Sequence, residues 1–284
     1  MKKLKRYAAL LLALTLVAGL LAGCRREDSL SFRVGFGRVP ATLDPALAAA
    51  DEEKIVVSHL FENLMKLQSD GSGGTTAVNG MARSYQCDAT AEGQATYTFT
   101  LRSATWSDGT KVTAQDFVYA WKRLVAPEPG SKNAKLLDMV AGYAAARAGD
   151  AEALQVSAPD EEAFVVALSG RCPEFIDSVC RAAVDQENWS MSASTLVTNG
   201  PYTVSSWEGD TLTLTQSADY HDKRRLGPEN LTFRFTADAK TANSLYDRGE
   251  VDFVLGLTEE AVAKKIDSWT PDSYPETSVV LLNQ

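Results

Sequence analysis

Residues 95–125 change their hydrophobic period midway, and this change constrains the fold more than any other feature of the sequence. Apolar residues first alternate with polar ones, as in a half-buried strand, and then recur at the spacing of an amphipathic helix. Asp108 and Gly109 lie between the two patterns and predict a tight turn. Thr113 and Asp116 predict the start of the helix, as a cap and as an acid in its first turn. A strand, a turn and a helix in immediate succession indicate a chain of mixed α and β structure.

The same mixture continues along the rest of the chain. Helical spacing or capping residues predict helices over residues 51–67, 113–126, 136–148, 172–183, 239–247 and 258–265. Alternating or apolar segments predict strands over residues 31–36, 95–102, 104–106, 163–168, 202–207, 211–216, 231–236, 251–255 and 278–282. The order is neither repetitive nor low in complexity, so the fold class is α/β in the broad sense that includes mixed α+β folds.

The N-terminus is typical of a secretory signal. Basic residues between Lys2 and Arg6 precede an apolar run over residues 8–21, which is shorter than the roughly 20 residues of a membrane span. Residues 21–24, Leu-Ala-Gly-Cys, resemble the lipobox of bacterial lipoproteins. The resemblance implies that residues 1–23 are removed and that Cys24 is diacylated, which anchors the chain to a membrane. The alternative is an ordinary cleaved signal with a chance cysteine.

The charge balance excludes one class of partner. Residues 1–23 hold four of the 28 basic residues and none of the 37 acidic ones, so the remaining 261 residues carry 24 − 37 = −13 charges. Nucleic acid binding depends on clustered Lys and Arg, so no nucleic acid partner is expected. A chain of this length can form one large domain or two smaller ones.

The cysteines and histidines do not indicate a metal or cofactor site. Cys172 and Cys180 could form a disulfide or could be two buried free thiols, and Cys87 stands apart. His59 and His221 lie far from the cysteines and from each other in sequence, so no zinc site is predicted. We expect no cofactor, and we expect His59 to be a surface or core-edge residue.

Two motifs are predicted to be structural. The WSDGT segment could suggest a catalytic pair of Ser107 and Asp108, but no histidine lies nearby and no nucleophile system is recognisable. Trp106 and Asp108 are instead expected to fix the turn by core packing and turn chemistry. Gly200, within Asn-Gly-Pro, predicts a connection between parts of the fold. The sequence therefore indicates no catalytic residue.

Six segments, in one order, carry a resemblance to a known family. They are TLDP (42–45), HLFENL (59–64), YTFTLRSATWSDGTKVTAQDFVYAWKR (97–123), NGPYTVSSW (199–207), DYHD (219–222) and RGEVDF (248–253). Together they resemble the extracellular solute-binding proteins that deliver oligopeptides, dipeptides and related solutes to ABC importers, and the likeness is greatest to the oligopeptide-binding members.

The resemblance implies a two-lobed clamp that closes on its ligand. Residues 24–48 and 186–284 would form lobe I, and residues 49–185 would form a domain inserted into it. The sequence ends near Asn283, about where the first lobe would hand over to the second, so the second lobe would be absent. Because half a clamp leaves its ligand in water, such a piece is expected to bind weakly or not at all.

The resemblance also implies where a ligand would lie. The two stretches are Arg38, Val39, Pro40 and Ala41, and Leu255, Gly256 and Leu257. An extended peptide could be held there by backbone hydrogen bonds, as in strand addition, although simple strand burial is an equal alternative for Leu255 and Leu257. The implied partners are a peptide, the permease and ATPase of an ABC importer, and the membrane through the lipid on Cys24. A monomer on the outer side of the cell membrane is expected.

Other functions stay open from the sequence alone. Within the family the solute could be a dipeptide, a metal chelate, heme or a sugar. Outside it, the chain could be a ligand-sensing lipoprotein without transport, or a secreted hydrolase, which would need paired carboxylates in a cleft.

Overall fold

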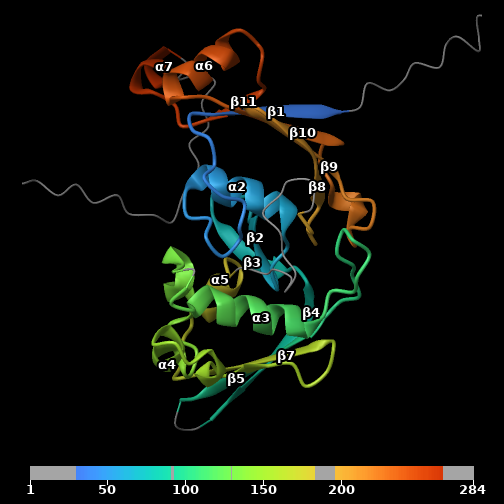
Figure 1. The fold of residues 1–284 in the computed structure, drawn as a ribbon, viewed down its shortest axis with the longest axis vertical. Helices are drawn as coiled ribbons and strands as arrows, with labels where there is room; N and C mark the ends of the chain where they lie inside the picture. Colours follow the sequence, from blue (N-terminus) through green and yellow to red (C-terminus); the bar gives the residue numbers. More distant parts are fainter. Residues whose placement is uncertain (1–29, 91–92, 129, 183–195, 265–284) are drawn as a thin grey trace, which may run out of the picture.

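A five-stranded mixed sheet lies at one end of the computed structural model, which describes residues 30–90, 93–128, 130–182 and 196–264 (Figure 1). Its strands, in spatial order, are β11 (Phe253–Leu255), β1 (Ser31–Phe36), β10 (Asn230–Phe235), β9 (Thr211–Gln216) and β8 (Tyr202–Glu208). β1 is parallel to both β10 and β11, whereas β8, β9 and β10 are antiparallel. The mixed α/β class expected from the sequence is confirmed.

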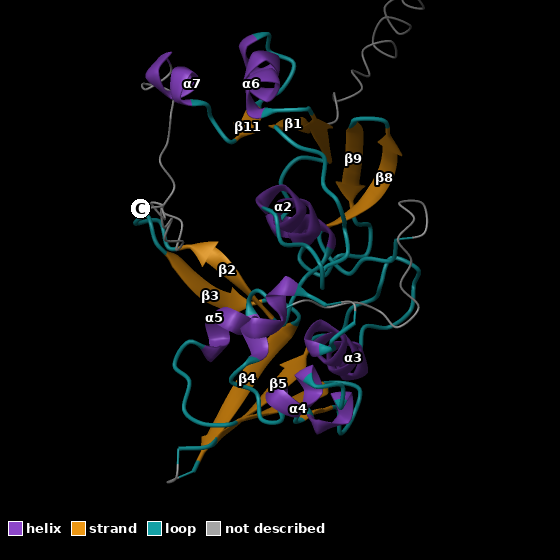
Figure 2. Cartoon of the chain, turned by 60° about the vertical axis from the view of Figure 1, so that its left-hand side comes forward, coloured by secondary structure: helices purple, strands orange, loops and turns teal. Residues whose placement is uncertain are grey.

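Helices lie on both sides of this sheet. α6 (Ala239–Asp247) and α7 (Glu259–Lys264) lie on one side, and α2 (Asp51–Leu60) lies on the other (Figures 1 and 2). Phe36 of β1 stacks on Phe233 and Phe235 of β10, with ring centroids 5.4 and 6.0 Å apart. Phe233 also contacts His59 of α2, so these rings form the core between the sheet and α2.

A second, antiparallel sheet lies at the other end of the molecule (Figure 2). Its strands, in spatial order, are β4 (Ala82–Ala89), β5 (Ala95–Leu101), β7 (Ala163–Leu168) and β6 (Val156–Ser157). Helix α3 (Ala114–Val125) packs on it and buries the apolar stripe expected from the sequence, which includes Phe117 and Trp121. The Trp121 ring meets that of Phe164 edge-on at 4.9 Å, which joins the helix to β7.

Short elements connect these layers. They are the hairpin β2 (Met65–Ser69) and β3 (Thr75–Asn79), the helices α4 (Tyr143–Arg147) and α5 (Phe175–Val179), and the 3-10 turns η1 (Lys132–Leu137), η2 (Ala151–Ala153) and η3 (Lys223–Arg225). Among the helices of the described residues, none has the length and apolar character needed to cross a membrane.

The turn before α3 has the structural role expected of it. Trp106 is fully buried, and its indole N–H donates to Asp116 at 3.2 Å. Asp108 accepts hydrogen bonds from the N–H and the hydroxyl of Thr110, at 2.9 and 2.6 Å. Gly109 has a φ of 86°, which a glycine adopts without strain.

The predicted helix over residues 51–67 is wrong in its second half. α2 ends at Leu60, and β2 begins at Met65. The Asn199 side chain accepts from the N–H of Glu62 and donates to its carbonyl, both at 3.0 Å, so the backbone of Glu62 is bonded across the fold and not within a helix. The helix therefore ends at Leu60, before the backbone of Glu62 bonds to Asn199.

The predicted helix over residues 136–148 is interrupted. Gly142 has a φ of 83°, and a Cβ at that position would lie 1.8 Å from the carbonyl oxygen of Ala153. The left-handed backbone at Gly142 separates η1 from α4.

Several other boundaries differ from the prediction. Of the predicted helix over residues 172–183, the described residues 172–182 form only the short helix α5. Residues 104–106 contribute one isolated bridge between Thr105 and Lys111, and β11 is shorter than residues 251–255. Strands β3, β4 and β6 were not predicted, because their residues lack a clean alternation, and β2 was missed because residues 65–67 were assigned to the predicted helix over residues 51–67. The predicted strand over residues 278–282 lies outside the described residues.

The burial of His59 is expected to make the stability of the fold depend on pH. It is half-buried, its ring lies 5.8 Å from that of Tyr202, and its Nδ1–H donates to the Ile55 carbonyl at 2.7 Å. Burial outweighs this hydrogen bond and lowers the pKa of His59. We expect the free energy of unfolding to fall as the pH drops below about 6.5, because the unfolded chain then binds a proton that the folded chain resists.

Urea unfolding at about pH 7.5 and about pH 5.5 measures this effect. His59→Phe keeps a ring in the core and removes the titration, so it is expected to lose less stability between the two pH values than the wild type. An equal loss in both proteins would contradict the assignment.

Candidate functional site

β1 and β11 end together at one edge of the five-stranded sheet. Phe36, the last residue of β1, lies beside Leu255, the last residue of β11, in parallel register. Residues 38–41 follow β1 and residues 256–257 follow β11, so both stretches predicted to bind ligand lie at the same edge. The carboxyl ends of neighbouring parallel strands are where open α/β sheets bind ligands.

The first stretch combines exposed and buried residues. The side chain of Arg38 is 62% exposed, and its guanidinium binds Glu52 Oε2 at 2.9 Å. Val39 is 50% exposed, whereas Pro40 is buried. Arg38 and Val39 therefore form the surface of this stretch, and Pro40 forms its support.

Within the described part of the chain, the backbone N–H groups of the first stretch are without a partner at two residues. Ala41 donates its N–H to Glu53 Oε1 at 3.0 Å, and Pro40 has no N–H. The backbone groups of Arg38 and Val39 have no hydrogen-bond partner among the described residues. A ligand that pairs with main-chain groups can do so at Arg38 and Val39 without breaking an existing bond.

The second stretch turns sharply at a glycine. Gly256 is exposed and has a φ of 78°, while Leu255 and Leu257 are half-buried. The Gly256 carbonyl accepts from Asn243 Nδ2 at 3.3 Å, so α6 holds the end of β11. The sequence did not indicate that Asn243 and Glu53 contact the two stretches. In the sequence, Glu53 appears only as one of the three acids at the start of α2.

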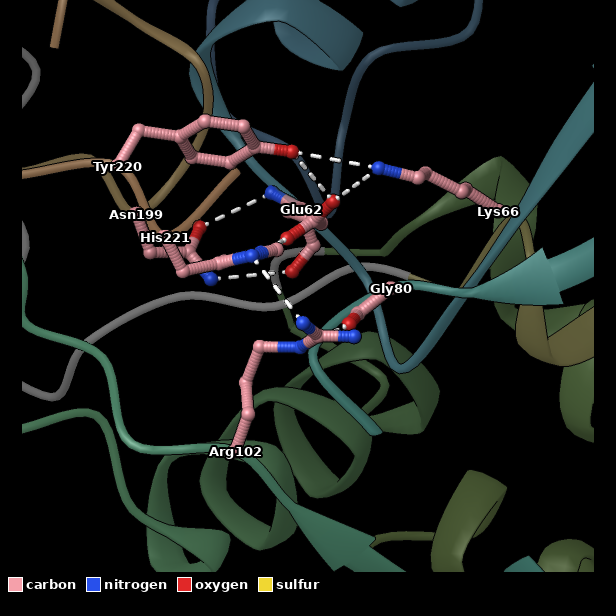
Figure 3. Close-up of polar contacts among 7 residues, drawn as sticks. All are labelled: Glu62, Lys66, Gly80, Arg102, Asn199, Tyr220 and His221. Atoms are coloured by element: carbon pink, nitrogen blue, oxygen red, sulfur yellow. Dashed lines mark hydrogen bonds and ion pairs between the residues drawn. The ribbon is translucent and has the colours of Figure 1, made fainter. Parts of the chain in front are cut away.

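A buried polar network has Glu62 at its centre (Figure 3). Glu62 is 4% exposed, and its carboxylate binds Lys66 Nζ at 2.6 Å, the Tyr220 hydroxyl at 2.7 Å and the His221 ring. Arg102 binds the other ring nitrogen of His221 at 3.3 Å. Because a guanidinium only donates, His221 Nδ1 accepts and the proton of the neutral ring is on Nε2, facing Glu62.

This network leaves no free general base. Burial would raise the pKa of Glu62, but the hydrogen bond from His221 and the charge of Lys66 outweigh burial and lower it. Glu62 is therefore ionised and fully occupied at neutral pH. Glu62 binds Lys66, Tyr220 and His221, and Arg102 binds His221, so the network joins distant parts of the chain.

Carboxylates also line a surface hollow of about 570 Å³ beside the second sheet. Glu161 binds Lys111 at 2.5 Å, Glu162 binds Arg83 at 3.3 Å, and Asp160 accepts from the N–H of Glu162 at 2.8 Å. Each of the three acids thus has a partner, and none is placed as the free member of a catalytic pair.

The three cysteines in the described part of the chain are unpaired. Cys87, Cys172 and Cys180 are free thiols, so the disulfide considered for Cys172 and Cys180 is not formed. Burial raises the pKa of Cys180 to about 12, which keeps this thiol protonated. Within the described residues no group of three or more His, Cys, Asp or Glu side chains could hold a metal ion. Cys24, the predicted lipidation site, lies outside the described residues.

Comparison with known proteins gives one consistent result. Residues 76–284 match the family described as bacterial extracellular solute-binding proteins, family 5. A dipeptide-binding protein of Lactococcus lactis is 28% identical over 264 residues, which cover 86% of this chain and 47% of that protein. The periplasmic oligopeptide-binding protein OppA of Escherichia coli is 30% identical over 247 residues, which cover 81% of this chain and 44% of that protein.

The fold gives the same result. The structure of OppA from Burkholderia pseudomallei superposes with a TM-score of 0.75 at 25% identity, over 85% of this chain and 49% of that one. This chain thus spans about half the length of the relatives that it matches.

Proposed function

This chain belongs to the bacterial extracellular solute-binding proteins of family 5, and we propose that it forms one jaw of a clamp that captures oligopeptides for an ABC importer. The observation that carries the proposal is the pair of parallel strand ends, with the exposed residues Arg38 and Val39 whose backbone groups have no hydrogen-bond partner among the described residues. Backbone pairing holds an extended peptide whatever its side chains are. Such a site suits the import of many different peptides.

The relatives favour peptides over the other solutes considered. The matched proteins of Lactococcus lactis and Escherichia coli are named for dipeptide and oligopeptide binding. We assign no enzymatic activity to the chain, because the family is one of solute-binding proteins and the carboxylates described above are paired.

We further propose the division expected from the sequence, with residues 24–48 and 186–284 in lobe I and residues 49–185 inserted, except that α2 is moved to lobe I. The five-stranded sheet, built from residues 31–36 and 202–255, supports this division. Because His59 of α2 packs on Tyr202 and Phe233, α2 fits better with lobe I, which favours a boundary near Leu60. Lipid on Cys24 would hold the chain, as a monomer, beside the importer's permease and ATPase.

Peptide binding by the 284-residue chain tests the proposal. Titration with tri-alanine, followed through backbone amide signals, is expected to shift Arg38, Val39, Gly256 and Leu257, with a dissociation constant on the order of millimolar because one jaw leaves the peptide in water. Calorimetry is expected to show no binding at micromolar or lower concentration.

N-acetylglucosamine serves as the control solute and is expected to shift none of these signals. The proposed site is wrong if tri-alanine perturbs only residues elsewhere, and micromolar affinity would show that one jaw suffices.

A further inference from the structure

Glu53 is a buried carboxylate beside the proposed peptide edge. It is 7% exposed, and both of its oxygens accept from backbone N–H groups. Oε1 accepts from Ala41 at 3.0 Å, and Oε2 accepts from Ala49 at 2.8 Å and from Ala50 at 2.9 Å. Burial would raise the pKa of Glu53, but these three bonds outweigh it and lower the pKa, so the group is charged at neutral pH.

Other side chains hold the rest of the loop between β1 and α2. Asp44 forms an ion pair with Arg123 of α3, and its Oδ1 accepts from the N–H of Ala46 at 2.9 Å. Asn133 donates to the Ala48 carbonyl at 2.7 Å. These contacts begin three residues after Ala41. Near Arg38 and Val39, Glu53 bonds to the backbone on one side, at the N–H of Ala41. On the other side, the hydroxyl of Thr236 donates to the carbonyl of Phe36, at 2.9 Å.

We propose that Glu53 is a positioning residue for peptide capture. By fixing the N–H of Ala41, and with the ring of Pro40 limiting rotation, it keeps the main-chain groups of Arg38 and Val39 turned toward the ligand. A strand end that is already ordered loses less conformational entropy when a peptide pairs with it. The inference rests on the proposed function, because it assigns Glu53 a role in that same site.

Glu53→Gln is expected to affect the bonds of the two carboxylate oxygens differently. The variant keeps one oxygen, which is expected to stay with the two donors Ala49 and Ala50, and the new amide NH2 then faces the N–H of Ala41. Two donors facing each other cannot form a bond, so the peptide end of the loop is released while the start of α2 stays held.

Glu52→Gln is the matched control. It makes the same charge change one residue away, but Glu52 bonds to the exposed guanidinium of Arg38 and not to a backbone N–H. Glu53→Asp is the second variant: the shorter carboxylate still suits the first turn of α2 but does not reach Ala41.

Tri-alanine titration of the 284-residue chain, followed through amide signals, is the test. We expect Glu53→Gln and Glu53→Asp to weaken binding at Arg38 and Val39 by about tenfold and to speed hydrogen exchange of the Ala41 amide by about tenfold. Glu52→Gln is expected to match the wild type in both. The signals come from folded molecules, so a loss of stability alone would not change the affinity they report.

The outcomes separate the two hypotheses. If tri-alanine leaves Arg38, Val39, Gly256 and Leu257 unchanged in the wild type, the proposed function fails. If the wild type responds and both Glu53 variants bind with unchanged affinity, the role of Glu53 is overturned while the peptide site stands. If Glu53→Gln does not fold, Glu53→Asp decides between these results.

Discussion

Replacing Glu62 by glutamine is expected to lower the free energy of unfolding by about 3 kcal/mol, because breaking a buried ion pair leaves charge uncompensated. The carboxylate is the anion that faces Lys66 and His221, and the cation of Arg102 lies on the other side of that ring (Figure 3). With a neutral amide in its place, Lys66 and Arg102 face a buried site without an anion.

The hydrogen bonds to Asn199 do not confound this experiment. They involve the backbone N–H and carbonyl of Glu62, which the substitution keeps. Glu161→Gln is the control, since it removes a carboxylate from an exposed pair with Lys111 and is expected to leave stability almost unchanged. Urea unfolding of the three proteins at neutral pH is the measurement. Equal stability of Glu62→Gln and Glu161→Gln would show that the network contributes nothing.

The dependence of stability on acid pH is a second test of the Glu62→Gln variant. The pKa of Glu62 is lowered in the folded chain, so its contribution to stability is complete above the ordinary value of about 4.3 and is lost as the pH falls through the lower, folded value. The wild type is therefore expected to lose more stability than Glu62→Gln on acidification below about pH 4.3.

Local chemistry explains which elements the sequence could predict. The turn at Asp108 and Gly109 and the cap at Thr113 depend on neighbours within a few residues, and the structure has them as expected. Thr258 is similar, because its hydroxyl accepts from the N–H of Ala261 at 3.2 Å at the start of α7. Such contacts join residues only two or three positions apart, so the local sequence is enough to predict them.

The errors came from contacts across the chain. Leu64 and Leu67 continue the helical spacing of α2, yet residue 199 bonds to Glu62 over a separation of 137 residues and ends the pattern. The same holds for Gly142, whose close approach to Ala153 depends on how α4 packs. Periodicity cannot show contacts of this kind.

The candidate site was only partly accessible from the sequence. The resemblance indicated both stretches, but not that β1 and β11 are parallel neighbours, which brings them together. It also could not show that the N–H of Ala41 is bonded to Glu53, which limits the available backbone N–H groups to those of Arg38 and Val39. Exposure and hydrogen bonding, not residue type, distinguish these positions.

Replacing Gly200 by alanine is expected to lower the free energy of unfolding by about 3 kcal/mol, as for an overpacked core. A Cβ at Gly200 would lie 2.5 Å from the carbonyl carbon and 2.6 Å from the carbonyl oxygen of Leu60, and 2.7 Å from the nitrogen of Phe61. All three are backbone atoms, so no side chain can rotate to make room. The N–H of Gly200 also donates to Leu60 O at 2.9 Å, which holds the two segments together.

Gly170→Ala is the matched control for this clash. No atom lies within 4 Å of a Cβ at Gly170, and its φ is outside the left-handed region, so alanine there is expected to be neutral or to stabilise by up to about 1 kcal/mol. Thermal and urea unfolding of both variants measure the difference. Because Gly200 lies beside Asn199, which ends α2, the loss in Gly200→Ala should be accompanied by faster hydrogen exchange of the Glu62 amide. A Gly200→Ala protein as stable as Gly170→Ala would mean that the end of α2 and the 199–201 segment can move apart at little cost, and that Asn199 alone does not fix where the helix stops.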